Sequence, residues 1–389
     1  MRVLLISHSC QSPTEGQPRA HALAALGDIE LKVLVPDRWL DYGNWRGPVV
    51  PNHADFDFHV GRVRWPWVGP AQCYLHYYPD LRDILLDFKP DVIDLWEEPW
   101  GLVSAHACRL RNQYLPGTKI VSETEQNTDK WFPPPFEFFR AYTLRNSDFA
   151  VGRSDEAISI LHKKGYSCPG DVVPNGVDAR MFSPMDRQKS RGDLNLSGFV
   201  VGYVGRLVAE KGLFDLLAAV RLCPPDVNCI FVGSGPLKDA LEQRAQLLGI
   251  ANRVRFLGPR PLEQLPPVMN AMDALVLPSR TTRHWKEQFG RVLIEANACE
   301  IPVIGSTSGA IADVIGKGGL VYPEGSHASL ANVIQRLRAS PEFWRILGES
   351  GRQQALERYT WERVAERLQG IYQRILTAAP LKEDRFAVV

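Results

Sequence analysis

The sequence predicts an α/β protein made of two Rossmann-like, doubly wound domains that face a cleft. Short apolar runs alternate with amphipathic helical patterns along most of the chain, which is typical of parallel sheets with helices on both faces. The chain has 389 residues, and at about 100–200 residues per domain this length indicates two cores. The alternation breaks once, in a polar run at residues 183–198.

The expected strands are continuous apolar runs that end at Gly, Ser, Pro or a polar residue, as buried parallel strands do. In the first half of the chain they lie at residues 3–7, 31–36, 91–96 and 119–123. In the second half they lie at residues 199–205, 228–233, 253–258, 274–279, 301–306 and 319–323. Amphipathic segments between them predict helices, among them residues 213–222, 236–249 and 329–338. Strand, helix and parallel strand in succession imply right-handed crossovers.

The polar run SPMDRQKSRGDLNLSG at 183–198 follows the turn signal Asn175-Gly176, so it predicts an interdomain linker. We therefore expect an N-terminal domain over residues 1–190 and a C-terminal domain over residues 191–389. The last helix, about residues 361–378, has no strand after it. It can therefore cover its own domain or cross back to the N-terminal one.

Composition and charge exclude several classes of protein. The formal net charge is +1, so no bulk field recruits nucleic acid or an anionic membrane. The seven cysteines are scattered without a Cys-x-x-Cys pair, which argues against disulfides and zinc and for a reducing compartment. No run reaches the roughly 20 apolar residues that span a bilayer, and MRVLLIS begins a strand without a signal core. We expect a cytoplasmic protein with at most peripheral membrane contact and no metal site.

Two cations lie in the loop after residues 199–205. In VGYVGRLVAEKGLFDLL, Arg206 and Lys211 precede a helix that begins after Gly212. A helix N-terminus offers free N–H groups and partial positive charge, and the Arg fork and Lys point charge suit a diphosphate. The alternative is a solvated loop with two surface cations. The GSG turn at 233–235 fits a ligand or a tight strand-to-helix turn equally well.

Two carboxylates, Glu287 and Glu295, lie in the segment EQFGRVLIEANACEIPVIGS. Glu287 is expected in a loop and Glu295 inside the helix that begins near Phe289-Gly290, and their spacing keeps both on roughly one side. Ionised carboxylates only accept hydrogen bonds, so their natural partners are pairs of sugar hydroxyl groups. The alternative is a pair of capping or surface glutamates.

The segment EQFGRVLIEANACEIPVI resembles the signature of the retaining family 4 (group 1) glycosyltransferases. Further motifs resemble that family in order and spacing: PNGVD at 174–178, VGRLVAEKG at 204–212, FVGSGPLKDAL at 231–241, RVRFLG at 253–258 and SGAIADVIGKGGLVYP at 308–323. The resemblance covers roughly residues 170–370. It implies the GT-B fold, a UDP- or GDP-linked sugar donor as substrate, and no cofactor.

The resemblance also implies roles for single residues. Arg206 and Lys211 would clamp the diphosphate, and Glu295 would hold the ribose hydroxyl groups. Glu287 would hold the donor hexose, together with the backbone at Phe289 and Gly290. The other members of the implied donor site, of which the first three would border the base, are Gly233, Arg255, Phe256, Gly205 and Arg291.

The chain departs from the family pattern in places. Glu300 stands where the family usually has glycine, so we expect a local change in that turn. The glycine-rich loop after the first strand is reduced to SHSCQSPTEGQPRAH, with the single Gly16.

A third departure concerns Glu125, in KIVSETEQNT. It stands where much of the family has a histidine that meets the donor sugar, and its polar neighbours are Glu123, Gln126 and Asn127. We therefore expect Glu125 to be catalytic alongside Glu287, Arg206 and Lys211.

The N-terminal half is rich in aromatic residues, which stack on sugar rings, sit at membrane interfaces or simply pack. They are Trp39, Tyr42, Trp45, Trp65, Trp67, Tyr74, Tyr77, Tyr78, Trp96 and Trp100. The segment DKWFPPPFEFFRAYTLR adds aromatics beside cations, and it fits an acceptor groove, a lipid contact or a helix packed on the core.

The sequence as a whole predicts a metal-independent, retaining hexosyltransferase acting on a hydroxyl acceptor in glycan, glycoconjugate or glycolipid biosynthesis. The acceptor would be a sugar, a lipid-linked or a small molecule. The alternatives are a nucleotide-sugar epimerase or phosphorylase of the same fold, or a non-catalytic sugar-binding protein. An NAD-dependent dehydrogenase is disfavoured because the dinucleotide fingerprint is incomplete.

Overall fold

The computed structural model describes residues 1–41, 44–65 and 72–378. Tyr42 and Trp67, two of the aromatic residues noted in the sequence, lie outside these ranges. The described chain divides into two compact units, Met1–Pro174 with the segment that begins at Trp361, and Asn175–Thr360. Each unit has its own parallel sheet and its own buried apolar core. The predicted α/β class with two doubly wound, Rossmann-like domains is therefore confirmed.

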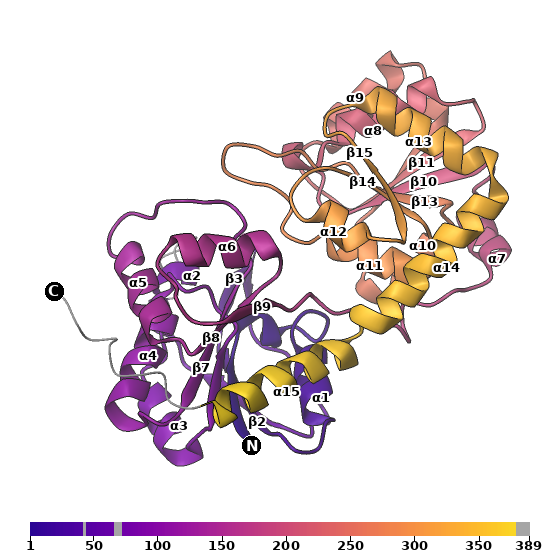
Figure 1. Cartoon of the computed structure of the whole chain (residues 1–389). Helices are drawn as coiled ribbons and strands as arrows, with labels where there is room; N and C mark the ends of the chain where they lie inside the picture. Colours follow the sequence, from indigo (N-terminus) through magenta and orange to yellow (C-terminus); the bar gives the residue numbers. More distant parts are fainter. Residues whose placement is uncertain (42–43, 66–71, 379–389) are drawn as a thin grey trace. The chain divides into compact units, whose positions relative to one another are not determined.

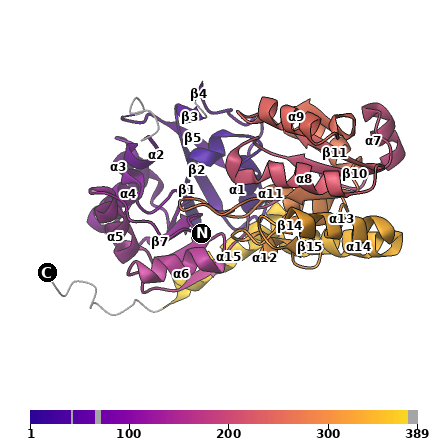
Figure 2. The ribbon, with the colours of Figure 1, turned by 90° about the horizontal axis from the view of Figure 1, so that it is seen from above.

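The first unit is built on a sheet with the strand order β5-β2-β1-β6-β7-β8-β9, in which all neighbours pair in parallel. Its strands are β1 (Arg2–Ile6), β2 (Glu30–Pro36), β5 (Asp57–Gly61), β6 (Val92–Leu95), β7 (Lys119–Thr124), β8 (Phe149–Gly152) and β9 (Gly170–Val172). A short antiparallel hairpin joins β3 (Trp39–Asp41) to β4 (Asn44–Arg46). Figure 2 shows this hairpin on the β5 side of the first unit.

Alternate side chains of β1 face opposite layers, as the pleat of a strand requires. Val3 and Leu5 pack with α1 and the final helix α15, whereas Leu4 and Ile6 pack with α3 and α4. The helices of the unit are α1 (Gln17–Ala24), α2 (Gln72–Leu75), α3 (Leu81–Phe88), α4 (Leu102–Tyr114), α5 (Phe136–Asn146), α6 (Asp155–Lys163) and α15 (Trp361–Thr377). The final helix thus belongs to the first unit, where it lies beside α1 (Figure 1).

The second unit is built on a sheet with the strand order β12-β11-β10-β13-β14-β15, again parallel throughout. Its strands are β10 (Phe199–Val204), β11 (Val227–Val232), β12 (Val254–Gly258), β13 (Ala274–Leu277), β14 (Val303–Ser306) and β15 (Gly319–Tyr322). Its helices are α7 (Arg187–Leu194), α8 (Leu213–Leu222), α9 (Lys238–Leu247), α10 (Leu265–Asn270), α11 (Arg291–Ala298), α12 (Ile311–Ile315), α13 (His327–Ala339) and α14 (Pro341–Arg358). Helices α8, α9 and α13 cover one face, and α11 and α12 cover the other (Figure 1).

Both sheets reverse their strand order at one point. In the first unit the chain runs from β1 outward through β2, and from β6 outward through β7 on the other side, with β1 and β6 paired. In the second unit β10 and β13 are the corresponding pair. Because right-handed crossovers in opposite directions put their helices on opposite faces, the loops after the two central strands diverge and leave room for a ligand.

The predicted domain boundary needs correction. We expected it between residues 190 and 191, but the units divide between Pro174 and Asn175. The polar run at 183–198 is not a plain linker, because it contains α7, which packs on α10. Arg187 and Arg191 of α7 both form ion pairs with Asp273. The helix has few apolar residues because charge pairing holds it to the unit, which is why its sequence looks like a linker.

Candidate active site

The loops after β10 and β13 of the second unit carry several of the residues predicted to bind the donor. Arg206 and Lys211 lie in the loop after β10, and a short 3₁₀ turn, Ala209–Lys211, leads into α8. Glu287 lies in the long loop between β13 and α11. Ligands of doubly wound sheets bind at this edge, so the residues predicted for the diphosphate and the hexose come from the two loops that flank it.

Lys211 and Glu287 form an ion pair at this edge. Lys211 Nζ lies 2.6 Å from Glu287 Oε2, and the two side chains are only 15% and 9% exposed. Ser279 Oγ donates a second hydrogen bond of 2.7 Å to the same carboxylate oxygen. The Trp285 ring lies 4.8 Å from Lys211 Nζ, in cation–π range. The predicted diphosphate cation and the predicted hexose carboxylate are therefore direct neighbours.

The two loops are held by further contacts within the unit. Arg280, after β13, forms a two-pronged ion pair with Asp215 of α8, with both N–O distances 2.6 Å. Its backbone N–H also donates to the carbonyl of Glu210 at 2.8 Å. Tyr203 Oη donates to the carbonyl of Arg206 at 2.7 Å, while the Arg206 side chain itself is exposed. The loop backbone is thus anchored, and a charged side chain extends from it into solvent.

Close backbone packing explains why the GSG turn has a glycine at position 233. Its φ is 135°, and a Cβ atom at this position would lie 1.9 Å from the carbonyl oxygen of Gly205. The loops after β10 and β11 therefore touch backbone to backbone, which only glycine permits. This contact explains Gly233 by packing, and its role beside the base stays a prediction.

The segment at the start of α11 contains residues of the buried core and residues at the edge of the sheet where ligands are expected. Phe289 is 4% exposed, and its ring packs edge-on against Tyr359, with centroids 5.9 Å apart. Gly290, with φ 82°, precedes α11 directly. Glu295 is buried in that helix, and burial raises the pKa of its carboxyl group, opposed by Arg291, whose Nη2 lies 4.0 Å away.

Arg255 and Phe256 make contacts that serve the fold. Arg255 Nη1 donates to the carbonyls of Leu194 and Asn195, at the end of α7. The Phe256 ring stacks on Phe231 at a centroid distance of 5.0 Å and an interplanar angle of 11°. Both residues precede Gly258, the carboxyl end of β12. Within the described residues, neither side chain forms a hydrogen bond, ion pair or ring contact with Lys211 or Glu287. Their place in the donor site stays a prediction.

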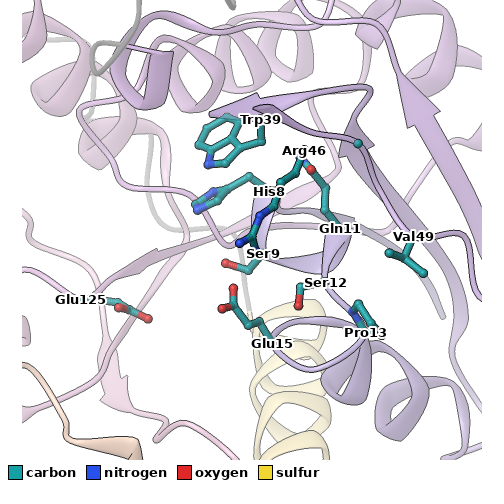
Figure 3. A pocket seen from close by; sticks show the side chains of 11 residues that line it. His8, Ser9, Gln11, Ser12, Pro13, Glu15, Trp39, Arg46, Val49 and Glu125 are labelled. Carbon is teal, nitrogen blue, oxygen red and sulfur yellow. The ribbon is translucent and has the colours of Figure 1, made fainter. Parts of the chain in front are cut away.

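The first unit has a pocket at its own point of strand reversal. This cavity of about 440 Å³ is lined by His8, Ser9, Gln11, Ser12, Pro13, Glu15, Trp39, Arg46, Gly47, Val49 and Glu125. In the view of Figure 3, Trp39, His8 and Arg46 lie above Ser9, Glu15 and Ser12, and Glu125 lies apart from both groups at the left. A smaller cavity of about 120 Å³ shares His8, Ser9 and Glu125 and reaches Trp96. Glu125 is thus the predicted catalytic residue that lines this pocket.

His8 and Glu97 follow the two central strands of the first unit and form a pair. His8 Nδ1 lies 2.9 Å and 2.8 Å from the two Glu97 oxygens, and the His8 backbone N–H donates to Oε1 at 2.6 Å. Trp39 stacks on the imidazole at 4.4 Å. Burial lowers the pKa of His8, but the carboxylate of Glu97 outweighs it, and the pKa is raised overall. The same pairing keeps the pKa of Glu97 low despite its burial.

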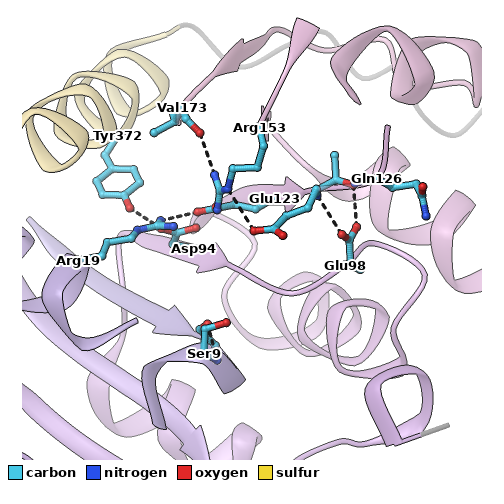
Figure 4. A network of polar contacts seen from close by, with 12 residues as sticks. Ser9, Arg19, Asp94, Glu98, Glu123, Gln126, Arg153, Val173 and Tyr372 are labelled. Carbon is cyan, nitrogen blue, oxygen red and sulfur yellow. Dashed lines mark hydrogen bonds and ion pairs between the residues drawn. The ribbon is translucent and has the colours of Figure 1, made fainter. Parts of the chain in front are cut away.

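Arg153 links Glu125 to a buried ionic network. Figure 4 shows the members of this network, Arg19, Asp94, Glu123 and Arg153. Arg153 Nε lies 3.4 Å from Glu125 Oε1, and Arg153 Nη2 donates to Glu123 at 2.5 Å. Glu123 also pairs with Arg19, which in turn pairs with Asp94. The backbone N–H of Glu125 donates to Glu98 Oε1 at 2.9 Å. The sequence predicted three polar neighbours of Glu125, namely Glu123, Gln126 and Asn127. Of these, Glu123 belongs to the ionic network.

The network contains two carboxyl groups with opposite shifts. Burial raises the pKa of Asp94 to about 7, although Arg19 opposes the shift. Burial acts in the same direction on Glu123, but Arg19 and Arg153 outweigh it and lower its pKa to about 2. Burial also raises the pKa of Glu98 to about 8. Glu123 is thus ionised at neutral pH, whereas Asp94 and Glu98 take up protons near neutral pH.

Comparison with known proteins identifies the second unit. The family described as "Glycosyl transferases group 1" matches residues 185–354, which lie inside the second unit and include the Lys211–Glu287 pair. This unit is a group 1 glycosyltransferase domain. Within the domain, the matched span covers all six strands of the sheet and both loops that diverge after β10 and β13.

Relatives and solved structures extend the comparison beyond the glycosyltransferase domain. A protein named D-inositol 3-phosphate glycosyltransferase, from Segniliparus rotundus, is 37% identical over 55% of this chain. The match covers 49% of that protein, so the chain spans about half the length of this curated relative. The sucrose-phosphate synthase of Thermosynechococcus elongatus has a TM-score of 0.77 and 23% identity over 97% of this chain and 100% of that one. HepE of Anabaena, solved in complex with UDP, has a TM-score of 0.75 and 19% identity, and the match covers 96% of this chain and 100% of HepE. These neighbours confirm the GT-B fold.

The glycosyltransferase domain also explains one departure from the family pattern. Glu300 follows α11 and has φ 65°. Its backbone N–H donates to the carbonyl of Asn297 at 2.9 Å. The backbone N–H of Ile301 donates to the carbonyl of Ala296 at 3.0 Å. These two bonds are those of a Schellman motif, whose left-handed position usually holds glycine. The chain keeps the turn and places a glutamate in it.

Sequence reasoning missed His8, Glu97 and the Arg19 network. The available signal was position: His8 follows β1 and Glu97 follows β6, the two strands between which the order reverses. A polar residue directly after each central strand is expected to face a ligand. That signal needs the strand order, which a single sequence does not display.

No group of three or more His, Cys, Asp or Glu residues in the described chain is placed to hold a metal ion. Within the same residues, no helix combines the length and the apolar character needed to cross a bilayer.

Proposed function

We propose that this protein is a retaining glycosyltransferase that moves a hexose from a nucleotide-diphosphate sugar, UDP- or GDP-linked, to a hydroxyl group of an acceptor. One observation carries the proposal. Lys211 and Glu287, from the two diverging loops of the group 1 domain, lie 2.6 Å apart. A cation suited to a diphosphate and a carboxylate suited to sugar hydroxyl groups are therefore adjacent at the edge where doubly wound sheets bind ligands.

The donor would lie across this edge with its charged part at the cations. Arg206, Lys211 and the N-terminus of α8 would neutralise the diphosphate. Glu287 would accept hydrogen bonds from the hexose, and Glu295 from the ribose. The UDP complex of HepE, a protein of the same fold, favours a uridine donor as the first to test.

In the transfer step, the bond between the anomeric carbon and the phosphate oxygen breaks, and a bond from that carbon to the acceptor oxygen forms. The acceptor proton goes to the departing phosphate oxygen, so no protein nucleophile is needed and the configuration is retained. Arg206 and Lys211 would stabilise the charge that grows on the leaving diphosphate. Because side chains supply these cations, we propose that the reaction is independent of metal.

The test is a panel of UDP- and GDP-linked hexoses, incubated with the full chain while released nucleotide is measured. Slow hydrolysis of one donor without acceptor, unchanged in excess EDTA, is the expected result. Complete loss of turnover in EDTA, restored by manganese, would contradict metal independence. No hydrolysis of any donor, or conversion of a donor into its epimer without nucleotide release, would overturn the transferase proposal.

We also place the protein in the cytoplasm, in contact with a membrane at most peripherally. Six of its cysteines are buried and form no disulfide within the described residues: Cys10, Cys108, Cys168, Cys223, Cys229 and Cys299. Free thiols suit a reducing compartment. The Trp131 and Phe138 side chains are 70% and 66% exposed, and aromatic side chains of this kind favour a membrane interface. Sedimentation with vesicles, compared between the wild type and Trp131→Ala, tests the contact.

A further inference from the structure

Lys211, the cation proposed to meet the donor's diphosphate, is almost closed off from solvent. Its side chain is 15% exposed. Glu287 Oε2 lies 2.6 Å from Nζ, and Nζ lies over the Trp285 ring, 4.8 Å from the ring centroid. An ammonium group that binds a phosphate needs at least one N–H direction open to it. A diphosphate that reaches Lys211 therefore has to displace one of these two neighbours.

Glu287 is the neighbour that is held in place. Ser279 Oγ donates a hydrogen bond of 2.7 Å to the same carboxylate oxygen that meets Lys211, and the Glu287 side chain is 9% exposed. The backbone is fixed as well, since the Ala310 N–H donates to the Glu287 carbonyl at 3.0 Å. A Cβ atom at Gly309 would lie 2.0 Å from that carbonyl oxygen, so the chain packs tightly there. Displacing Glu287 would leave a buried carboxylate without its cation, which is costly.

Trp285 is held by fewer contacts. It lies in a surface turn in which the Thr282 N–H donates to the Trp285 carbonyl at 2.7 Å and the Trp285 N–H donates back to Thr282 Oγ1 at 3.0 Å. Thr282, Arg283 and His284 are all exposed. Within the described residues the indole forms no hydrogen bond, and its one ring or cation contact is the one with Lys211. A cation–π contact contributes only a small stabilisation, so Trp285 is the neighbour that can yield.

The turn at 282–285 has a fixed point at each end. Before it, the N–H and the hydroxyl group of Thr281 donate to the two carboxylate oxygens of Glu324, at 2.6 Å and 2.8 Å. After it comes Glu287, with its own buried contacts. The hydrogen bonds that the turn makes within the described chain are internal. The turn can therefore change position as one piece, by rotation of the backbone next to the two anchors, while the Lys211–Glu287 pair stays formed.

We propose that Trp285 is a displaceable cover on the diphosphate site, closed over Lys211 in the free protein and swung aside when a nucleoside diphosphate binds. The cover lowers the measured affinity, because only the fraction of molecules with an open site can bind. It also makes the site selective. A ligand has to replace the lost cation–π contact, which a diphosphate does by its charge and a neutral sugar does not. Naming the diphosphate as the ligand rests on the proposed function, whereas the contact between Trp285 and Lys211 does not.

The experiment measures the binding of UDP and of GDP to the full chain by calorimetry, in the wild type, Trp285→Leu and Trp285→Phe. Leucine is apolar but has no π face, so Trp285→Leu should bind the nucleotide roughly 3–10-fold more tightly than the wild type. Phenylalanine attracts a cation less strongly than tryptophan, so Trp285→Phe should show a smaller gain. In a Lys211→Ala background, Trp285→Leu should bring no gain, because no ammonium group is left to cover.

Fluorescence provides a second measurement. Nucleotide binding should change the indole fluorescence of the wild type, and Trp285→Leu should lose most of that change. Phe343→Leu is the matched control in the same unit, because it removes a cation–π contact in which Arg336 lies 4.7 Å from the Phe343 ring centroid. This control should leave nucleotide affinity unchanged. Circular dichroism verifies that each variant is folded.

Weaker nucleotide binding in Trp285→Leu would show that Trp285 holds the ligand instead of covering the site, and this result overturns the inference. An unchanged affinity, a gain that persists without Lys211, or a fluorescence change kept in full by Trp285→Leu overturns it as well. Binding of UDP or GDP by Trp285→Leu but not by the wild type supports it.

Donor hydrolysis measured on the same samples separates this inference from the proposed function. Tighter nucleotide binding in Trp285→Leu without hydrolysis of any nucleotide sugar leaves the cover standing and contradicts the transferase. Hydrolysis together with an unaltered nucleotide affinity in Trp285→Leu leaves the transferase standing and contradicts the cover. No binding of UDP or GDP by the wild type or by Trp285→Leu overturns both.

Discussion

Tyr372 and Asp94 meet in the core of the first unit, where Tyr372 Oη donates a hydrogen bond of 2.5 Å to Asp94 Oδ2. The two residues are 278 positions apart in the chain, in α15 and in the central strand β6. Asp94 also pairs with Arg19 of α1. A buried polar contact therefore joins α15 to the middle of the first sheet, in addition to the apolar packing of this helix.

We expect Tyr372→Phe to lower the free energy of unfolding of the first unit. A buried hydrogen bond to an ionised acceptor contributes about 1.5–3 kcal/mol, and Asp94 Oδ1 already has no partner in the described chain. Urea unfolding followed by fluorescence measures the change. Tyr78→Phe is the control, because the buried Tyr78 hydroxyl makes no hydrogen bond in the described chain. This substitution should leave the free energy of unfolding nearly unchanged.

The same variant should show a pH dependence. Burial raises the pKa of Asp94 to about 7 in the folded protein, above its unfolded value, so Asp94 is protonated below this pH and ionised above it. The Tyr372 hydroxyl stabilises the ionised form and opposes the shift. The loss of stability in Tyr372→Phe should therefore grow as pH rises through about 7. A loss that is equal on both sides of that pH contradicts this assignment.

Lys211 and Glu287 should separate nucleotide affinity from turnover. Lys211→Ala removes a charge-assisted contact of about 1.5–3 kcal/mol to the diphosphate, so nucleoside diphosphate binding should weaken roughly 10–100-fold. Glu287→Gln should leave that affinity unchanged or tighter, because the 2.6 Å ion pair no longer offsets the Lys211 charge, while turnover collapses. Calorimetry and donor hydrolysis measure the two effects. Lys238 is an exposed lysine of α9, and Lys238→Ala is the control that should change neither nucleotide affinity nor turnover. Equal losses of nucleotide affinity in Lys211→Ala and Glu287→Gln would refute the division of roles.

Glu295 should make nucleotide binding depend on pH. Burial raises the pKa of this carboxyl group above its usual value, whereas accepting ribose hydroxyl groups requires the ionised form. Affinity should therefore fall as pH drops through the raised pKa. Glu295→Gln should bind more weakly at neutral pH and lose this pH dependence. Calorimetry with the ribonucleotide and its 2′-deoxy analogue over a range of pH tests the role, and an unaltered pH profile in the variant excludes it.

Glu300→Gly should stabilise the second unit. A residue other than glycine at φ 65° carries a steric cost of roughly 1–2 kcal/mol, part of which is offset by the greater freedom of glycine in the unfolded chain. We expect a net gain of about 0.5–1 kcal/mol in the free energy of unfolding. Thermal unfolding measures it. Glu300→Ala keeps the Cβ atom and loses the carboxylate, so a gain of the same size in that variant would attribute the effect to charge instead of backbone strain.

Local patterns in the sequence determined most of the second unit. Runs such as 199–205 and 228–233 predicted β10 and β11 because a strand buried on both faces needs a continuous apolar stretch. The expected strands did not include β8, the β3–β4 hairpin or the edge strands β5 and β9. Most residues of the two edge strands are only partly buried, so they need no continuous apolar run. The polar helix α7 was mistaken for a linker because its ion pairs are formed with Asp273, far away in the chain.

The sequence by itself placed Arg206, Lys211, Glu287 and Glu295 in a loop or helix and indicated their chemistry, because motif spacing is a local property. Only the tertiary structure decided which of them meet. Lys211 and Glu287 are 76 positions apart, and His8 and Glu97 are 89 apart. Each pair forms because two central strands lie side by side and their following loops diverge. Strand order arises from long-range pairing and core burial, which no local period in one sequence records.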